Sequence, residues 1–297
     1  MAARSRRAAR RPRRICGAME VHFRLLEQDP GFRRRQALLE EQIARRRMLP
    51  FKIAELPIAR IPVAVHVVYN KDPDNISDAQ VKSQIESLNR DFRATNADRK
   101  KTPPVWQGLV ADARVEFRLA KITRTHTTQP SFGADDGVKS SDSGGVDALD
   151  PTAYLNIWVC KLSGGLLGYA QFPGGPTATD GVVITTTAFG TKGTTTAPFD
   201  KGRTATHETG HYLNLRHIWG DTEDCSGSDF VPDTPNCAGP NYGTPAFPHI
   251  TCSNGPSGDM FMNYMDYVDD AAMFMFTPQQ VARMRAALDG PRRSLWS

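Results

Sequence analysis

Residues 207–217 contain three histidines and a glutamate at the spacing of a metal site with its own base. His207 and His211 are four residues apart, so on a helix both imidazoles face one point. Glu208 follows the first histidine directly, and its carboxylate can reach a water on the metal but cannot be a third ligand from that face. The pattern predicts a zinc ion bound by His207, His211 and His217, with Glu208 as general base.

His217 lies too far along the chain to share the helical face of His207 and His211. We expect the helix to break near Asn214 and the chain to swing back, because asparagine is the best tolerated non-glycine residue at positive φ. His-Glu-x-x-His alone arises by chance in roughly one chain of this length in a hundred. A second motif, Asn-Tyr-Met-Asp-Tyr at residues 263–267, has the form of a Met-turn, and the conjunction makes chance a poor explanation.

Together these motifs resemble those of the metzincin metallopeptidases, and within them the pappalysin family with its small ulilysin-like members. Further stretches similar to that family are residues 167–173, 180–184, 216–221 and 258–267. The resemblance covers about residues 61–297. It implies a zinc-dependent endopeptidase in which Met265 is a hydrophobic floor beneath the metal and the Tyr267 hydroxyl points to the reacting carbonyl oxygen.

Cys16 gains a role from the same resemblance. Residues 14–17 read Arg-Ile-Cys-Gly and are similar to the Arg-x-Cys-Gly stretch with which ulilysin-like propeptides supply a fourth zinc ligand and keep the enzyme latent. A thiol beside arginines ionises more readily than a free one, and thiolates bind zinc. The alternative is an incidental surface cysteine.

The resemblance therefore implies a zymogen that is activated by cleavage of its propeptide. We expect residues 1–60 to form the propeptide and residues 61–297 the catalytic domain, with residues 48–60 as a linker. Basic candidate cleavage sites are the arginine run at 45–47 and Arg60.

Positive charge is concentrated in the N-terminal segment. Residues 1–47 hold fourteen arginines and five acids, a net charge of +9, which leaves −4 for the rest of a chain whose total is +5. A basic nucleic-acid surface on the catalytic part is thereby disfavoured. For residues 1–14 alone, a solvated tail or a nucleic-acid arm explains the arginines as well as any specific role.

Five cysteines leave at least one unpaired. Related proteins pair cysteines at the positions of Cys225 and Cys252, so we expect that disulfide, which would constrain the unfolded chain by roughly 3 kcal/mol in an oxidising compartment. Cys237 is either a free thiol or displaces Cys225 in the pairing. Cys160 lies in an alternating stretch and is expected to be a buried thiol.

Hydrophobic periodicity and turn residues predict an α+β fold, and the resemblance implies that it is a metzincin-type catalytic domain. Strands are predicted at residues 61–69, 115–123, 154–162 and 181–187, with an edge strand in 164–175 that accepts an extended peptide. Helices are predicted at 77–92 with Ser77 as N-cap, at 204–214, at 278–288, and once or twice within 20–47. This order indicates a twisted mixed sheet with a zinc-bearing helix, a loop-rich C-terminal subdomain and a cleft between them.

Asp229, Asp233 and Thr234 offer hard oxygen ligands at a loop spacing suited to calcium. Ulilysin-like members hold calcium in this loop, so we expect Ca²⁺ in addition to Zn²⁺. Several of those members also use an acidic side chain to select arginine or lysine after the scissile bond. Here that position is Ala271, so a basic preference is not expected unless Asp269 or Asp270 substitutes.

The expected partners are protein or peptide substrates, with no nucleic acid and no membrane, and the expected state is a monomer. No stretch of eighteen apolar residues exists, which excludes a transmembrane helix, and the start lacks the apolar core of a signal peptide. We expect secretion, through a leader upstream of this start or by another route, with action inside a cell as the alternative. The alternative function is a catalytically inactive zinc-binding protein of the same fold, and the presence of Glu208 and Tyr267 argues against it.

Overall fold

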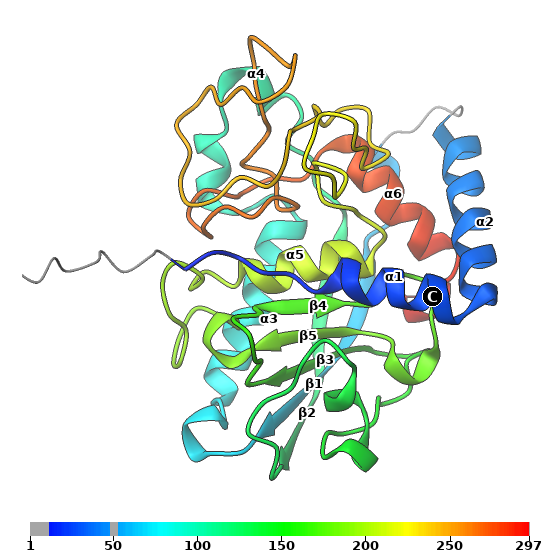
Figure 1. Cartoon of the computed structure of the whole chain (residues 1–297), viewed down its shortest axis with the longest axis vertical. Coiled ribbons are helices and arrows are strands. Elements are labelled where there is room, and N and C mark those ends of the chain that lie inside the picture. Colours follow the sequence, from blue (N-terminus) through cyan, green and yellow to red (C-terminus); the bar gives the residue numbers. More distant parts are fainter. Residues whose placement is uncertain (1–11, 48–52, 297) are drawn as a thin grey trace, which may run out of the picture.

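The computed structural model describes residues 12–47 and 53–296. A five-stranded sheet forms one half of the molecule (Figure 1). Its strands are β1 (Ala59–Tyr69), β2 (Val115–His126), β3 (Leu155–Cys160), β4 (Gly168–Ala170) and β5 (Val182–Thr185). They lie in the order β2-β1-β3-β5-β4, and all neighbours are parallel except β4, which is antiparallel to β5. The predicted mixed sheet, with its edge strand at β4, is confirmed.

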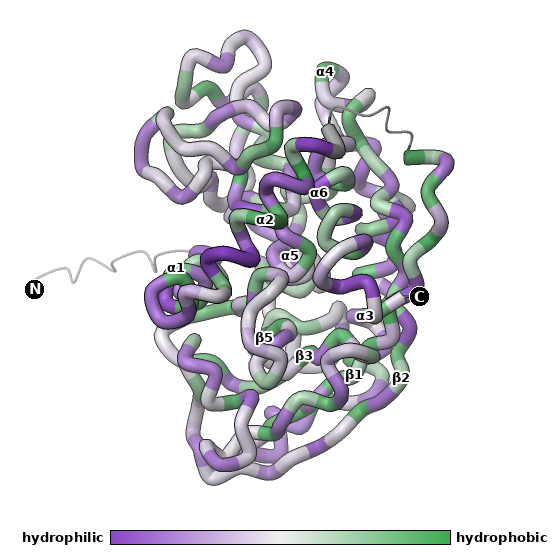
Figure 2. Tube along the Cα trace, turned by 90° about the vertical axis from the view of Figure 1, so that its right-hand side faces the viewer, coloured by the Kyte–Doolittle hydropathy of each residue, from purple (hydrophilic) through white to green (hydrophobic). Residues whose placement is uncertain are grey.

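The central strands are apolar on both faces, as parallel strands covered on both sides must be. All six residues of β3 are buried, and Figure 2 shows hydrophobic residues along β1 and β3. One face carries the main core, which continues beneath the zinc motif and the Met-turn. The other face carries a smaller core in which Trp158 and Val183 pack with Ala18 and Val21 of the N-terminal segment. That segment therefore completes the burial of the sheet.

Helices lie around the sheet rather than on one side of the molecule (Figure 1). They are α1 (Ala18–Gln28), α2 (Pro30–Arg47), α3 (Asp78–Phe92), α4 (Pro104–Gln107), α5 (Arg203–Tyr212) and α6 (Pro278–Asp289). The predicted N-cap is present, since the Ser77 side chain accepts a hydrogen bond from the Gln80 amide. Thr277 and Gln280 form a capping box at the start of α6. None of the helices in the described ranges combines the length and apolar character needed to cross a bilayer.

Between α5 and α6 every residue is described, and the chain there forms loops without a further named helix or strand. These loops are stacked above the sheet half in Figure 1 and make up the predicted loop-rich C-terminal half. The expected disulfide between Cys225 and Cys252 is present. Cys160 and Cys237 are free thiols and both are buried, which resolves the open question about Cys237.

The N-terminal segment lies on the catalytic part, with α1 across the sheet edge and α2 beside α6 (Figure 1). Leu39 and Ile43 of α2 pack with Ala286 of α6. Strand β1 begins at Ala59, so the last two residues of the predicted linker 48–60 belong to the sheet. Residues 48–52 of that linker lie outside the described residues.

Candidate metal centre

The three predicted histidines converge on one point. His207 and His211 lie one turn apart on α5, and His217 follows in the loop after it. Their Nε2 atoms lie 3.1 to 3.2 Å from one another, and all three rings are buried. Nitrogens about 2.0–2.1 Å from a tetrahedral metal lie roughly 3.3 Å apart, so the three rings fit a shared metal ion.

The turn after α5 brings His217 back, as the sequence predicted. The helix ends at Tyr212, and Asn214 has a φ of 75°, in the left-handed region. The Leu215 amide donates to the Gly210 carbonyl oxygen at 2.9 Å and closes the turn. Asparagine at this one position therefore sets the direction of the third ligand.

Each imidazole is oriented by a hydrogen bond at its Nδ1 atom. His207 Nδ1 lies 2.7 Å from the Tyr264 carbonyl oxygen, His211 Nδ1 lies 2.8 Å from that of Leu215, and His217 Nδ1 lies 2.5 Å from Asp221 Oδ1. Because each acceptor requires a proton on Nδ1, the Nε2 lone pairs face the common centre. Burial lowers the pKa of His207 and of His211 well below the usual range, which keeps both rings in the neutral form that binds metal.

The Cys16 thiol completes a cluster of four. Its Sγ and the three ring nitrogens all lie within 4.8 Å of one another. It donates a hydrogen bond to Glu208 Oε2 at 3.3 Å. Burial raises the pKa of the Glu208 carboxyl to about 8, and burial together with the Glu208 charge raises the pKa of the thiol well above its ordinary value. A cation between the histidines would favour the thiolate instead, because opposite charge stabilises it.

Two residues of the predicted Met-turn lie against this cluster. Met265 is fully buried beneath α5, where a Cβ on Gly210 would collide with its Sδ. The Tyr267 hydroxyl donates to the Cys16 carbonyl oxygen at 3.5 Å, and its ring meets that of His217 edge-on at 4.9 Å. Met265 therefore has the position of a floor, and Tyr267 faces a carbonyl oxygen next to the metal ligands.

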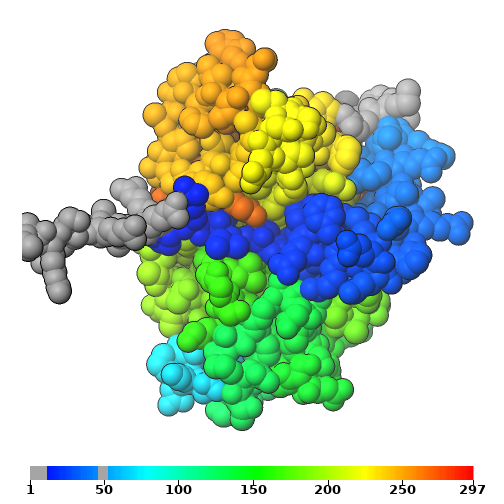
Figure 3. Space-filling model, in the orientation of Figure 1, coloured from blue at the N-terminus to red at the C-terminus, as the bar shows by residue number. Residues whose placement is uncertain are grey.

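Residues 15–17 pair with β4 as an added strand. The Leu167 amide donates to the Ile15 carbonyl oxygen and the Gly17 amide to that of Gly168, both at 2.9 Å. Cys16 pairs with Gly168 in the parallel sense. Figure 3 shows this blue segment filling the furrow between the sheet half and the loop-rich half. The edge strand predicted to accept an extended peptide thus holds the chain's own N-terminal segment.

Arg14 fills a buried pocket beside the histidines. Its guanidinium lies 2.7 Å from Asp270 Oδ1, donates to Thr204 Oγ1 at 2.9 Å, and lies 3.4 Å from the Val268 carbonyl oxygen. Only 2% of Arg14 is exposed. The sequence offered Asp270 as a substitute for the acid missing at Ala271. Asp270 lies one residue before that expected position, and it faces an arginine.

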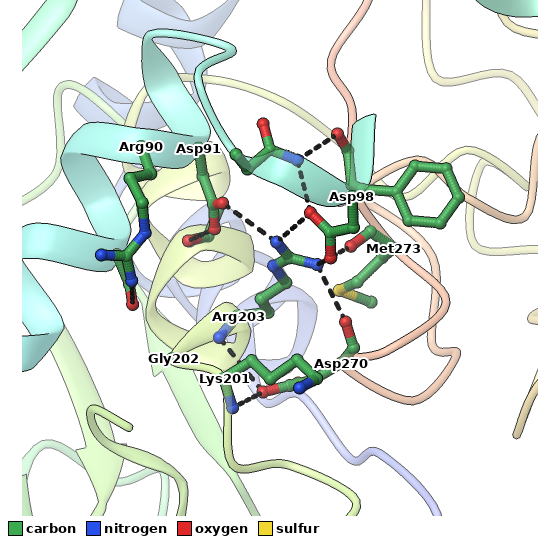
Figure 4. Close-up of polar contacts among 12 residues, drawn as sticks. Arg90, Asp91, Asp98, Lys201, Gly202, Arg203, Asp270 and Met273 are labelled. Atoms are coloured by element: carbon green, nitrogen blue, oxygen red, sulfur yellow. Dashed lines mark hydrogen bonds and ion pairs between the residues drawn. The ribbon is translucent and has the colours of Figure 1, made fainter. Parts of the chain in front are cut away.

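Asp270 is fixed by the start of α5. Its Oδ2 accepts hydrogen bonds from the backbone amides of Lys201 and Arg203 (Figure 4). The Arg203 side chain in turn donates to the carbonyl oxygens of Asp270 and Met273 and is paired with Asp98 at 2.7 Å. One carboxylate oxygen is thus tied to the helix terminus while the other faces Arg14.

The three predicted calcium ligands divide into two groups. Asp229 Oδ2 accepts a hydrogen bond from Thr234 Oγ1 at 2.7 Å, and both residues are buried. Both oxygens of Asp233 instead accept hydrogen bonds at the start of α6, from the Thr277 hydroxyl and the Gln279 amide. Burial raises the pKa of Asp229 to about 7.

The chain is similar to known peptidases over most of its length. The profile of the peptidase family described as pregnancy-associated plasma protein-A matches residues 139–289. An extracellular metalloprotease of Trichophyton verrucosum is 34% identical over 232 residues, 75% of each chain. One of Pyricularia oryzae is 30% identical over 278 residues, 91% of this chain and 86% of that one.

Solved structures extend the similarity to the N-terminal segment. Mature mirolysin of Tannerella forsythia, in complex with a cleaved peptide, is 50% identical with a TM-score of 0.80, covering 81% of this chain and 96% of that one. A promirolysin mutant of the same organism is 45% identical with a TM-score of 0.86, covering 95% of this chain and 97% of that one. The predicted fold, with a segment ahead of the catalytic part, is confirmed. The chain belongs to the pregnancy-associated plasma protein-A (pappalysin) family and is a metalloendopeptidase made as a zymogen.

Proposed function

We propose that the metal is zinc, held by His207, His211 and His217, and that Cys16 takes the fourth position in the latent form. Three imidazoles and one thiolate are ligands that suit tetrahedral zinc. The observation that carries the proposal is the mutual distance of 3.1 to 3.2 Å between the three Nε2 atoms. Each ring is also oriented by a hydrogen bond at its Nδ1 atom, as metal-binding histidines usually are.

When bound, the metal would supply a nucleophilic water near neutral pH and would polarise the peptide carbonyl. Glu208 would accept a proton from the attacking water and deliver it to the departing amine. Its carboxylate stands next to the ligand cluster, where it now accepts a hydrogen bond from the Cys16 thiol. Tyr267 donates to the Cys16 carbonyl oxygen, which stands in for a substrate carbonyl, so its hydroxyl can stabilise the developing oxyanion.

Residues 1–60 act as the propeptide and residues 61–297 as the catalytic domain in this proposal. The segment occupies the cleft at Cys16 and Arg14, so a substrate cannot bind until it leaves. The coverage of the two mirolysin forms supports this division, since the mature form spans 81% of this chain and the proenzyme 95%. The relatives are named extracellular metalloproteases and the chain carries a disulfide, which supports secretion of the enzyme.

The proposed substrates are proteins with a basic residue beside the scissile bond. Arg14 pairs with Asp270 in a buried pocket next to the metal ligands, and a substrate arginine or lysine can take its place when the segment leaves. A buried carboxylate selects a cation because leaving it unpaired costs free energy. The absence of an acid at Ala271 therefore does not exclude a basic preference.

Calcium remains part of the proposal at Asp229 and Thr234. Asp229 is buried, and its raised pKa reflects a carboxylate whose charge is poorly compensated there. A bound cation would stabilise the ionised form. Asp233 is the weaker candidate, because both its oxygens already accept hydrogen bonds at the start of α6.

Substitution of Glu208 tests the proposed chemistry. Wild type, Glu208→Ala and the exposed control Glu86→Ala would be followed over time by mass spectrometry, with zinc quantified in each. We expect wild type and Glu86→Ala to lose an N-terminal segment, while Glu208→Ala binds zinc and stays whole, with turnover lower by about 10²–10⁴-fold or more. A Glu208→Ala protein that still cleaves peptide bonds would defeat the proposal. If wild type stays intact too, the assay is repeated after trimming by a separate protease.

A further inference from the structure

Two adjacent arginines of the N-terminal segment occupy two neighbouring sites of the cleft. Arg14 reaches into the pocket of Asp270, and Arg13 lies beside a groove of about 600 Å³ that is lined by Tyr242 and Asp269 among others. Successive side chains of an extended segment point in opposite directions. The burial agrees with this, since Arg14 is buried and Ile15 is 45% exposed. The segment thus presents one arginine to each of two neighbouring sites.

Tyr242 forms the floor of the second site. The Arg13 guanidinium carbon lies 4.5 Å from the centroid of the Tyr242 ring, within the range of a cation–π contact. The Tyr242 ring also contacts that of Tyr267, with centroids 6.1 Å apart, so this site lies next to the reaction centre. A guanidinium is well suited to such a site because it can stack on an aromatic face while its donors remain in water.

The two sites belong to one scaffold. Gly243 pairs with Val268, and the Asp269 amide donates to the Gly243 carbonyl oxygen at 2.8 Å. Val268 also supplies a carbonyl oxygen 3.4 Å from the Arg14 guanidinium. Because the strand-like contact fixes Tyr242 relative to Asp270, the spacing between the two sites is set by the fold and matches consecutive residues of an extended peptide.

We propose that the groove at Tyr242 and Asp269 is a second specificity site, and that the enzyme favours substrates with two adjacent basic residues beside the scissile bond. This inference rests on the proposed function and narrows its substrate class. Asp270 selects the first basic residue in the buried pocket. Tyr242 and Asp269 select its neighbour at the exposed rim.

The chain's own candidate cleavage sites differ in this respect. Residues 45–47 are three consecutive arginines at the end of α2, whereas Arg60 is a single basic residue inside β1, paired in register with Glu116. A strand in the middle of the sheet cannot enter the cleft without unfolding. A preference for paired basic residues therefore directs the first self-cleavage to the run at 45–47, of which the side chains of residues 46 and 47 lie outside the described part.

The test uses the enzyme activated from the full-length zymogen and quenched peptides that differ only in having one or two adjacent basic residues beside a common scissile bond. Wild type, Tyr242→Phe and Tyr242→Ala are compared by the ratio of kcat/KM for the two-arginine and one-arginine peptides. We expect a ratio of about 2 to 5 for wild type and Tyr242→Phe, the scale of an exposed cation–π contact, and a ratio near 1 for Tyr242→Ala. Asp270→Asn is expected to weaken cleavage of both peptides relative to a neutral one.

A wild-type ratio near 1, with the one-arginine peptide still cleaved, would overturn the second site and leave the proposed function intact. This outcome does not depend on the folding of any variant. Absence of cleavage of every peptide by activated wild type would contradict the proposed function and this inference with it. First self-cleavage at Arg60 rather than within residues 45–47 would also count against the paired preference.

Discussion

The metal centre has two sides that are held in different ways. The permanent side consists of the three histidines of the catalytic part, and the removable side consists of Cys16 and the N-terminal segment around it. The three histidines are fully buried, and each is oriented by a hydrogen bond from its Nδ1 to a group of the catalytic part. The fourth group, Cys16, is only partly buried and belongs to a segment that docks from outside. Its neighbours are held by two backbone hydrogen bonds to the edge of the sheet and by the ion pair of Arg14 with Asp270.

This difference separates metal binding from latency. The histidine side is preorganised by groups that remain when the propeptide leaves, so it should bind metal without Cys16. The removable side depends on many contacts that do not involve the metal, made by α1, by α2 and by Arg14 in its pocket. Latency is therefore a property of the docked segment, and the thiol is one of its contacts.

Of the substitutions that test this difference, removal of the Cys16 thiol should have the largest effect. In Cys16→Ala we expect zinc to stay bound at one ion per chain, while loss of the N-terminal segment becomes faster by at least about 100-fold. A metal–thiolate bond should contribute more than the roughly 2–3 kcal/mol of a charge-assisted hydrogen bond, and 1.4 kcal/mol is tenfold. Zinc quantification and a mass-spectrometric time course check both halves of the prediction.

Ile15→Ala is the matched control, because Ile15 is exposed and its backbone contact is kept. It should remain as latent as wild type. Loss of zinc from Cys16→Ala would show that the thiol is needed to hold the metal, and unchanged latency would show that the strand and Arg14 block the cleft alone. Either result breaks the division between the two sides.

A substitution on the permanent side should change the metal affinity instead. Asp221 accepts the hydrogen bond from His217 Nδ1, and it has a φ of 61°. Asparagine tolerates that conformation, so Asp221→Asn removes the charge with little backbone strain. We expect zinc to bind about 10- to 100-fold more weakly, measured by competition with a chelator, with Asp224→Asn as an exposed control. An affinity equal to wild type would mean that the rings are held without this carboxylate.

Much of the permanent side could be predicted from the sequence because its geometry depends on residues that are close together in the chain. The spacing of His207 and His211 follows from one helical turn, and the left-handed residue at Asn214 places His217. The helix at α3 was predicted together with its cap at Ser77 for the same reason. Asp221 was not recognised as a partner of His217, although its position four residues later was a visible signal.

The removable side could be predicted only through the resemblance, and incompletely. Arg14 and Asp270 are 256 positions apart, and no periodicity connects them. The sheet edge at β4 was predicted to accept a peptide, but nothing in the local sequence indicates which segment lies there. Contacts between elements that fold separately and then dock depend on tertiary geometry, which sequence spacing does not carry.

Acid should weaken docking of the N-terminal segment through protonation of His22, with a smaller effect than the substitutions above. His22 lies on α1, packs on Phe172 with ring centroids 4.6 Å apart, and is 1% exposed. Burial, with a smaller contribution from the Arg216 charge and opposed by Asp221 and Glu40, lowers its pKa from 6.5 to about 4. The docked state therefore binds fewer protons than the undocked one between these values, so docking is complete above pH 6.5 and weakens as the pH falls toward 4. In a Glu208→Ala background, we expect hydrogen exchange of the α1 amides at pH 5, corrected for intrinsic rates, to rise by about tenfold over pH 7, within the roughly 20-fold limit that this pKa shift sets, and His22→Leu to abolish the rise. The exposed His126→Leu should behave as its parent, and a rise that persists in His22→Leu would assign the acid sensitivity to another group.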